Sequence, residues 1–94
     1  MAEVAAPPQA FAERLLEALK QGLAKVGISA EIEVEPVPTT LLHRVLVVSP
    51  QWGNLSFSDR QEVVWRVLDH AFPRDEHLYV SSIWTMTPDE MEGK

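Results

Sequence analysis

Apolar residues recur every three or four positions in two segments, a spacing that places them on one face of a helix. The first predicted helix runs from Phe11 to Val26, and Gly27 follows it as a residue suited to a left-handed helix end. The second runs from Asp59 to Phe72. Ser58 and Gln61 at its start have the spacing of a capping box. Both segments are therefore expected to pack one apolar face against a core.

Strict alternation of apolar with mostly acidic residues from Ile28 to Glu35 predicts a half-buried strand. Pro36 and Pro38 follow that strand and are expected to stop it. The side of this strand that faces solvent then carries three carboxylates: Glu31, Glu33 and Glu35. A strand of this kind has one face on a core and one face free for solvent or a partner.

A second strand is predicted from Leu41 to Val48, where the run is almost wholly apolar, and a third from His77 to Met86. The short proline-containing segment between the first two strands favours an antiparallel hairpin. A one-turn helix is expected after Thr87. The order α-β-β-α-β(-α) predicts an α+β two-layer sandwich, a three-stranded sheet with its helices on one face. The residues expected to be buried are Leu15, Leu19, Leu23, Ile32, Val34, Val64, Val67 and Leu68.

The chain has 94 residues, a length typical of one domain, and we expect a flexible arm at 1–8 and a single domain at 9–94. It contains no cysteine, which excludes disulfides and thiolate metal sites within this chain. Acidic residues outnumber basic ones 14 to 8, so phosphate-rich nucleic acid is an unfavourable partner. The first residues lack the features of a secretory signal. No apolar run approaches the ~20 residues that span a membrane, and a cytoplasmic location is expected.

Short motifs in the second half of the chain resemble those of the BolA family. A His opens the second strand and a Ser ends it, an aromatic residue and a glycine follow, and an Arg starts a helix that carries a Val-aromatic pair. The chain then finishes with Thr-Pro-x-Glu. These residues are His43, Ser49, Trp52, Gly53, Arg60, Val64, Trp65, Thr87, Pro88 and Glu90. The resemblance implies a BolA-like fold, which is related to one version of the KH fold.

The resemblance also implies a small protein-interaction module rather than an enzyme, with a monothiol glutaredoxin as partner and a role in iron–sulfur trafficking or sensing. Family members that hold a cluster use a residue in the loop between the first two strands and a His in the last strand. His77 resembles that His, so it is the candidate metal ligand, and only together with a partner. The isolated chain is expected to bind no cofactor, and a shared iron–sulfur cluster is the group that the resemblance implies.

Three departures separate the chain from the family pattern. Gln61 stands where the family usually has His, and the loop EPVPTT has neither His nor Cys. His77 lies two residues farther from Pro88 than the pattern expects. These departures fit a branch that has kept the fold and lost the metal chemistry.

The candidate partner-binding residues come from three segments. If the hairpin is antiparallel, Arg44 lies beside the glutamates of the first strand on the open face, whereas His43 faces the core. Tryptophan is enriched at interfaces but also fills the cores of small domains. Trp52 lies in a loop beside a glycine, where its ring must either tuck under the loop or contact a partner. The complete set of candidates is Leu42, Arg44, Leu46, Trp52, Arg60 and Trp65.

Other functions remain as alternatives to a BolA-type module that binds glutaredoxin. A lineage-specific adaptor would keep the fold, use an unrelated protein partner and have no metal role, and a homodimer would use the same surface for a second copy. A nucleic-acid-binding transcriptional regulator is disfavoured by the acidic balance and by the absence of a GxxG loop. The sequence has no P-loop, no Ser-centred elbow and no GxGxxG motif, so an enzyme is not expected.

Overall fold

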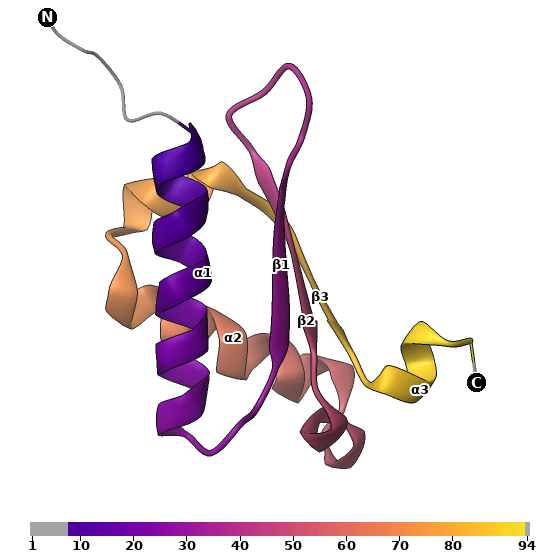
Figure 1. The fold of residues 1–94 in the computed structure, drawn as a ribbon. Coiled ribbons are helices and arrows are strands. Elements are labelled where there is room, and N and C mark those ends of the chain that lie inside the picture. The colour runs from indigo at the N-terminus through magenta and orange to yellow at the C-terminus, as the bar shows by residue number, and fades with distance from the viewer. Residues whose placement is uncertain (1–7, 94) are drawn as a thin grey trace, which may run out of the picture.

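The computed structural model describes residues 8–93. Its elements are α1 (Pro8–Lys25), β1 (Glu31–Pro36), β2 (His43–Val48), the 3-10 helix η1 (Pro50–Asn54), α2 (Phe57–Ala71), the 3-10 helix η2 (Arg74–Tyr79), β3 (Val80–Met86) and α3 (Pro88–Met91). Of the predicted arm at 1–8, all but Pro8 lies outside the described residues, and Pro8 begins α1. Figure 1 shows α1 and α2 together on one side of the sheet and α3 beyond its other side.

The three strands form one mixed sheet in the order β1-β2-β3. β1 and β2 are antiparallel, with Glu33 opposite Leu46, which confirms the predicted hairpin. β2 and β3 are parallel, with Leu46 opposite Trp84. The chain therefore has the predicted two-layer α+β arrangement, with both long helices on one face of the sheet.

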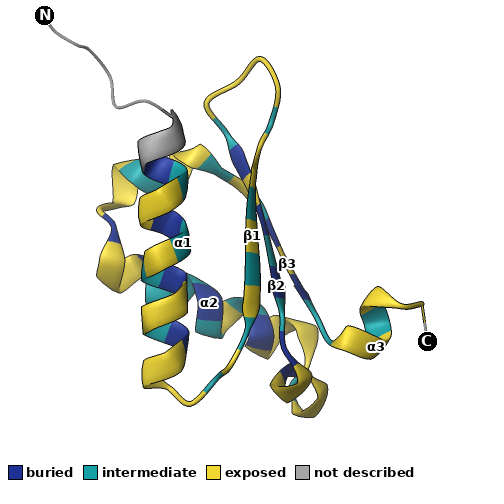
Figure 2. Ribbon diagram, in the orientation of Figure 1, coloured by how far each residue is buried: buried dark blue, intermediate teal, exposed yellow. Residues whose placement is uncertain are grey.

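The core lies between this sheet and the two long helices, and Figure 2 shows buried positions along α1, α2 and the sheet. Each fully buried Leu or Val contributes roughly 2 kcal/mol through removal of its side chain from water. Among the predicted core residues, Ile32, Val34 and Val67 are only partly buried, though they pack against the core. β1 is an edge strand, which leaves Ile32 and Val34 less covered. The fully buried predicted residues are Leu15, Leu19, Leu23, Val64 and Leu68.

Helix α1 ends at the glycine that the sequence indicated. Gly27 has a φ of 81°, in the left-handed region that other residues rarely adopt. Its N–H donates to Ala24 O at 3.0 Å, and the N–H of Ile28 donates to Leu23 O at 2.9 Å. This pair of bonds is a Schellman motif, which satisfies carbonyls that the end of the helix would otherwise leave unpaired. It also turns the chain directly toward β1.

Helix α2 begins two residues earlier than predicted, and the predicted capping box of Ser58 and Gln61 is wrong. Ser56 is the cap, because its Oγ accepts a hydrogen bond from the Asp59 N–H at 3.1 Å. The side chain of Gln61 instead donates to Ile83 O at 2.8 Å. Gln61 therefore ties α2 to β3 rather than closing its own helix end.

The third strand begins later than predicted, at Val80 instead of His77. In the parallel pairing, the first residue of β2, His43, already lies opposite Val80. Residues 77–79 therefore have no strand to pair with. They form the second half of η2, which follows Pro73 and in which the Glu76 N–H donates to Pro73 O at 3.0 Å. The candidate ligand His77 consequently lies on a 3-10 helix and not on a strand.

Candidate functional site

The face of the sheet opposite α1 and α2 carries three rows of three side chains, which we call the outer sheet face. The register aligns one residue from each strand in every row. The rows are Glu31, Val48 and Met86; Glu33, Leu46 and Trp84; and Glu35, Arg44 and Ser82. Each row starts with a carboxylate on β1, and two of the three rows continue with apolar side chains.

Exposed apolar surface is concentrated on the β3 side of this face. Trp84 is 59% exposed, although a buried Trp side chain would contribute strongly to a core. Met91 of α3, which is 48% exposed, lies beside it. Met91 lines two shallow depressions, one with Val48 and the other with Trp84 and Met86. The outer sheet face therefore has an apolar strip between an acidic edge and the C-terminal turn.

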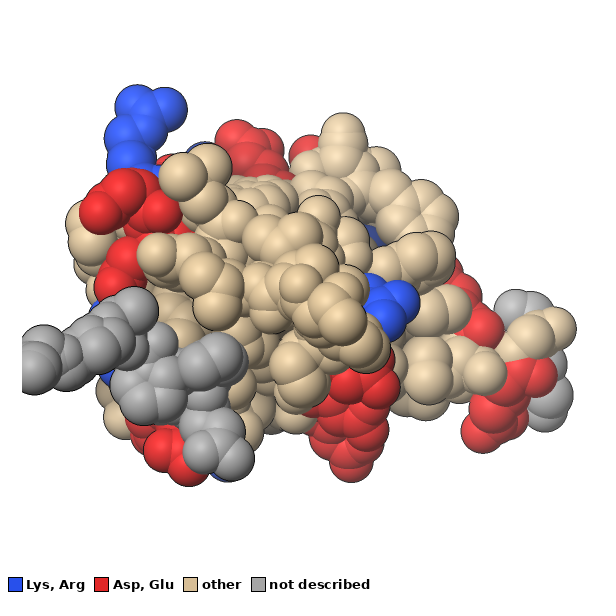
Figure 3. Space-filling view, turned by 90° about the horizontal axis from the view of Figure 1, so that it is seen from above, with Lys and Arg blue, Asp and Glu red and all other residues tan. Residues whose placement is uncertain are grey.

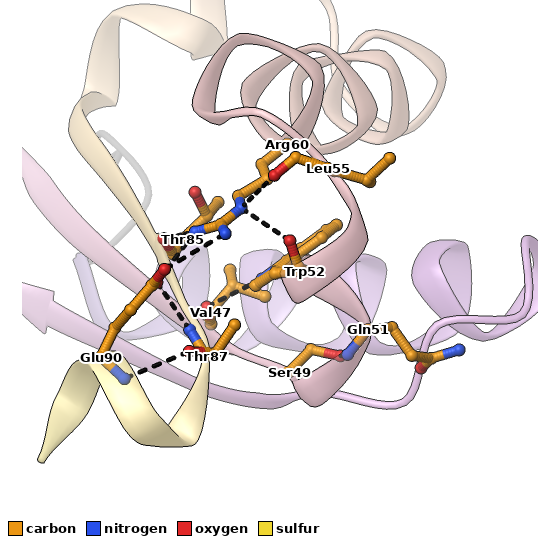
Figure 4. A network of polar contacts seen from close by, with 9 residues as sticks. All are labelled: Val47, Ser49, Gln51, Trp52, Leu55, Arg60, Thr85, Thr87 and Glu90. Carbon is orange, nitrogen blue, oxygen red and sulfur yellow. Dashed lines mark hydrogen bonds and ion pairs between the residues drawn. The ribbon is translucent and has the colours of Figure 1, made fainter. Parts of the chain in front are cut away.

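A buried arginine fixes that C-terminal turn to the body of the protein (Figure 4). The Arg60 side chain is only 6% exposed and makes a two-point ion pair with Glu90, at 2.9 Å to Oε1 and 3.2 Å to Oε2. It also donates to the carbonyl oxygens of Trp52 at 3.0 Å, Leu55 at 3.1 Å and Thr85 at 3.2 Å. One guanidinium therefore joins η1, β3 and α3.

Glu90 has a second partner that strengthens this arrangement. Its Oε1 accepts a hydrogen bond from the Thr87 N–H at 2.9 Å, and its own N–H donates to Thr87 Oγ1 at 3.1 Å. These two bonds form a capping box at the start of α3, the one-turn helix expected after Thr87. The Arg60 guanidinium and the Thr87 N–H lower the pKa of the Glu90 carboxyl below its usual value of 4.5.

Trp52, proposed as a partner-binding residue, is completely buried. Its Nε1 donates to Val47 O at 3.1 Å, so the ring fills the core and its polar atom is satisfied. Ser49 caps η1 through its Oγ, which accepts from the Gln51 N–H at 3.2 Å and donates to Ser29 O at 2.7 Å. The proposal of Trp52 as a surface contact is wrong, because the capped turn of η1 folds the ring inward.

The predicted partner residues do not form one surface. Arg60 is also buried, and its charge is used within the fold. Trp65 lies on α2, partly buried against the core, with its Nε1 3.3 Å from Gln61 Oε1. Arg44 and Leu46 lie on the outer sheet face as predicted, and Leu42 lies in the turn before β2. Sequence reasoning did not select Trp84, although alternation along the third strand places Ser82, Trp84 and Met86 on one side.

His77 lies between Trp65 and Asp69, on the far side of the molecule's core from the outer sheet face. Its Nδ1 is 3.6 Å from Asp69 Oδ1, and its ring centroid is 5.9 Å from that of Trp65. In metal sites, a carboxylate beside Nδ1 commonly orients the His ring so that Nε2 can bind the metal. However, Nε2 is inaccessible to solvent and has no hydrogen-bond partner. In this conformation, His77 does not fit a cluster supplied by another protein.

His43 is buried, as predicted from its position in the second strand. Its ring packs against Phe11, with the centroids 5.2 Å apart. Neither Nδ1 nor Nε2 of His43 has a hydrogen-bond partner. His43 therefore acts as a core-filling side chain and contributes nothing to a site.

Within residues 8–93, no group of three His, Cys, Asp or Glu side chains is placed to hold a metal ion. Over the same range, every helix is too short or too polar to cross a lipid bilayer.

Neither a model of a protein family nor a curated protein matches the sequence. Among solved structures, the chain is similar to the crystal structure of a Bol-like protein from Babesia bovis, with 16% sequence identity and a TM-score of 0.54. The similarity covers 99% of this chain and 96% of that one. The chain therefore has a BolA-like fold, and a similarity at this level of identity establishes the fold alone.

Proposed function

We propose that this protein works as a small protein-interaction module of BolA type and binds its partner through the outer sheet face. The observation that supports this proposal is the exposure of Trp84, beside Leu46 and Met86, on the side of the sheet that α1 and α2 leave free. Apolar side chains grouped on a surface and bordered by charge are typical of protein-binding sites.

The charges of the molecule favour a protein partner over nucleic acid. Figure 3 shows acidic groups spread around the rim of the molecule, with few basic groups on the face in view. On the outer sheet face, Glu31, Glu33 and Glu35 outnumber Arg44. Carboxylates repel phosphates, whereas nucleic-acid binding requires several Lys or Arg side chains to neutralise them.

Quantitative capture of proteins from cell extract at physiological salt tests this function. Wild-type chain is compared with Leu46→Glu, which puts a charge into the apolar strip. The matched control is Leu78→Glu, which adds the same charge at a position on η2 that is 73% exposed. We expect a partner that wild type and Leu78→Glu retain and Leu46→Glu loses. Identical sets of proteins for all three variants would contradict the proposal.

We further propose a monothiol glutaredoxin as the partner class to test first, in a role in iron–sulfur trafficking or sensing. The support is the BolA-like fold together with the motif resemblance. Calorimetric titration of the chain with purified monothiol glutaredoxin measures the affinity directly. A dissociation constant weaker than about 1 mM, while the capture experiment succeeds, would favour an adaptor with an unrelated partner.

The metal role depends on His77. If the complex holds a cluster through this residue, His77→Ala abolishes the visible absorbance of the shared cluster and leaves the melting temperature almost unchanged. The side chain would first have to turn out from beside Trp65, because its Nε2 is inaccessible in the structure. A complex whose cluster absorbance is the same with His77→Ala would show that the family's metal role does not transfer to this residue.

A further inference from the structure

We propose that the outer sheet face binds an amphipathic helix of the partner, with its apolar side on the strip of β2 and β3 and a row of Lys or Arg over β1. This inference rests on the proposed function and specifies the chemistry of the partner. It follows from three properties of the face: the side chains it presents, its length and the spacing of its charges.

The face offers side chains rather than free backbone groups. The central strand β2 is hydrogen-bonded on both sides, to β1 and to β3. Along the outer edge of β3, the carbonyls of Ile83 and Thr85 already accept hydrogen bonds from the Gln61 and Arg60 side chains. A partner strand could therefore add only beside β1. The apolar strip itself would be covered by an element that presents one apolar face, such as a helix.

The length of the face fits a short helix. β2 has six residues and β3 has seven. At roughly 3.3 Å per residue, these strands span about 20 Å. An α-helix rises 1.5 Å per residue, so about 14 residues would cover the same length. Met91 of α3 lines both depressions along the strip, so the bound helix would have to pack beside it.

The charges on β1 match a helix in their spacing. Glu31, Glu33 and Glu35 are exposed and point to the same side of the sheet at every second position, which separates them by roughly 6.6 Å. Residues four apart in an α-helix lie on one side at intervals of about 6 Å. Basic residues at every fourth position of a helix along β1 would therefore pair with the three carboxylates in turn.

A second copy of this chain fits the face less well. Two copies that met through their outer sheet faces would bring both sets of the three β1 glutamates together. Each copy also carries a net charge of −6. Like charges close together oppose association, whereas a basic helix would neutralise them. Complementary charge therefore selects a basic partner.

The probe for this inference is a synthetic 14-residue helical peptide with Leu on one side and Lys at every fourth position. A second peptide with Glu in place of Lys is the charge-reversed control. Each is titrated at physiological salt into the ¹⁵N-labelled full chain, and the NMR signals of backbone amides and Trp indoles are followed. We expect the Lys peptide to shift the Trp84 indole and the amides of all three strands, and the Glu peptide to shift none.

Two pairs of variants locate the binding. Glu33→Gln should weaken binding of the Lys peptide several-fold, whereas Glu13→Gln removes the same charge from the exposed side of α1 and should have no effect. Leu46→Glu should weaken binding about tenfold or more, as expected for a residue at the centre of an interface. The inference is overturned if Glu33→Gln and Glu13→Gln bind the Lys peptide with equal affinity. It is also overturned if the peptide shifts amide signals across α1 and α2, or if the shifts are confined to β1.

The two proposals can fail separately. If the Lys peptide does not bind while a partner in the capture experiment still depends on Leu46, the helix inference is wrong and the proposed function stands. A capture experiment in which no partner depends on Leu46 removes the proposed function, whatever the peptide does.

Discussion

Arg60 illustrates how a charged residue can serve the fold alone. A buried charge is unfavourable unless hydrogen bonds compensate for its lost hydration. The guanidinium of Arg60 meets that condition with three backbone carbonyls and both carboxylate oxygens of Glu90 (Figure 4). Its Cζ also lies 4.6 Å from the centroid of the Phe57 ring.

We expect Arg60→Ala to lower the free energy of unfolding by about 3 kcal/mol, because buried carbonyls lose a charged donor. Urea denaturation followed by circular dichroism measures the change. The control is Arg66→Ala, which removes a pair with Glu62 in which both side chains are mostly exposed. That variant should change stability by less than about 0.5 kcal/mol. Similar losses for the two variants would contradict the structural role of Arg60.

The lowered pKa of Glu90 makes part of the stability depend on pH. A carboxyl whose pKa is lower in the folded state stabilises the protein above its unfolded pKa, and that stability is lost as pH falls through the folded value. The ordinary value is 4.5, so the loss should begin near there and continue at lower pH. Glu90→Gln should therefore be less stable than wild type at pH 7, and the difference should shrink in unfolding measurements below pH 4.5. A stability difference between Glu90→Gln and wild type that stays the same at every pH would contradict the pH-dependent role of Glu90.

The errors at residue level in the sequence analysis have a common cause. Residue type and spacing show which face of an element a side chain occupies, but not what covers that face. Trp52 was therefore assigned to the surface, although η1 turns it inward. Trp84 could have been found by alternation, since it stands two residues from Ser82 and from Met86 on the third strand.

At the scale of elements, the start of α2 depends on Ser56 rather than Ser58. Replacement of a cap residue by Ala usually costs about 1 kcal/mol, because an N–H at the helix start loses its acceptor. We expect that loss for Ser56→Ala, where the Asp59 N–H loses its partner. Ser58→Ala, in the exposed first turn, should leave the melting temperature unchanged or slightly higher. If instead Ser58→Ala lowers the melting temperature and Ser56→Ala does not, Ser58 is the cap, as the sequence predicted.

The contact between α1 and α2 depends on a residue without a side chain. A Cβ at Gly22 would clash with the side chain of Val67. Val is stiff about χ1 and cannot easily turn aside. Gly22→Ala should therefore destabilise the protein by roughly 1–3 kcal/mol in urea denaturation, despite the better helix propensity of Ala.

The double variant Gly22→Ala, Val67→Ala supplies the control for this contact. Removal of the Val67 methyl groups makes room for the new Cβ, so the double variant should lose less stability than the two single changes added together. Additive losses would show that the clash with Val67 is not the cause.

The elements differed in how well the sequence predicted them. The long helices and the β1–β2 hairpin follow from local periodicity and from short-range pairing, and they were found to within a few residues. The start of β3 is set by β2, a strand more than thirty residues earlier, because His43 lies opposite Val80. Local pattern contains no information about that limit, so η2 was missed.

At the scale of the whole molecule, the sheet separates a closed side from an open one. α1 and α2 bury the side that holds Val45 and Val47. Within residues 8–93, the side that holds Leu46 and Trp84 is covered only by α3, near one end (Figures 1 and 2). The proposed function and the helix inference both depend on this separation.

The most direct test of the open side compares the free energies of unfolding of Leu46→Glu and Val45→Glu in urea. These neighbouring residues receive the same charge on opposite faces of β2. We predict that Leu46→Glu remains folded and loses less than about 1 kcal/mol, because Leu46 is only partly buried and its new carboxylate can reach water. Val45→Glu should lose more than about 4 kcal/mol or fail to fold, because it buries an unpaired carboxylate. If Leu46→Glu unfolds the protein as Val45→Glu does, the outer sheet face belongs to a core and cannot be a partner surface.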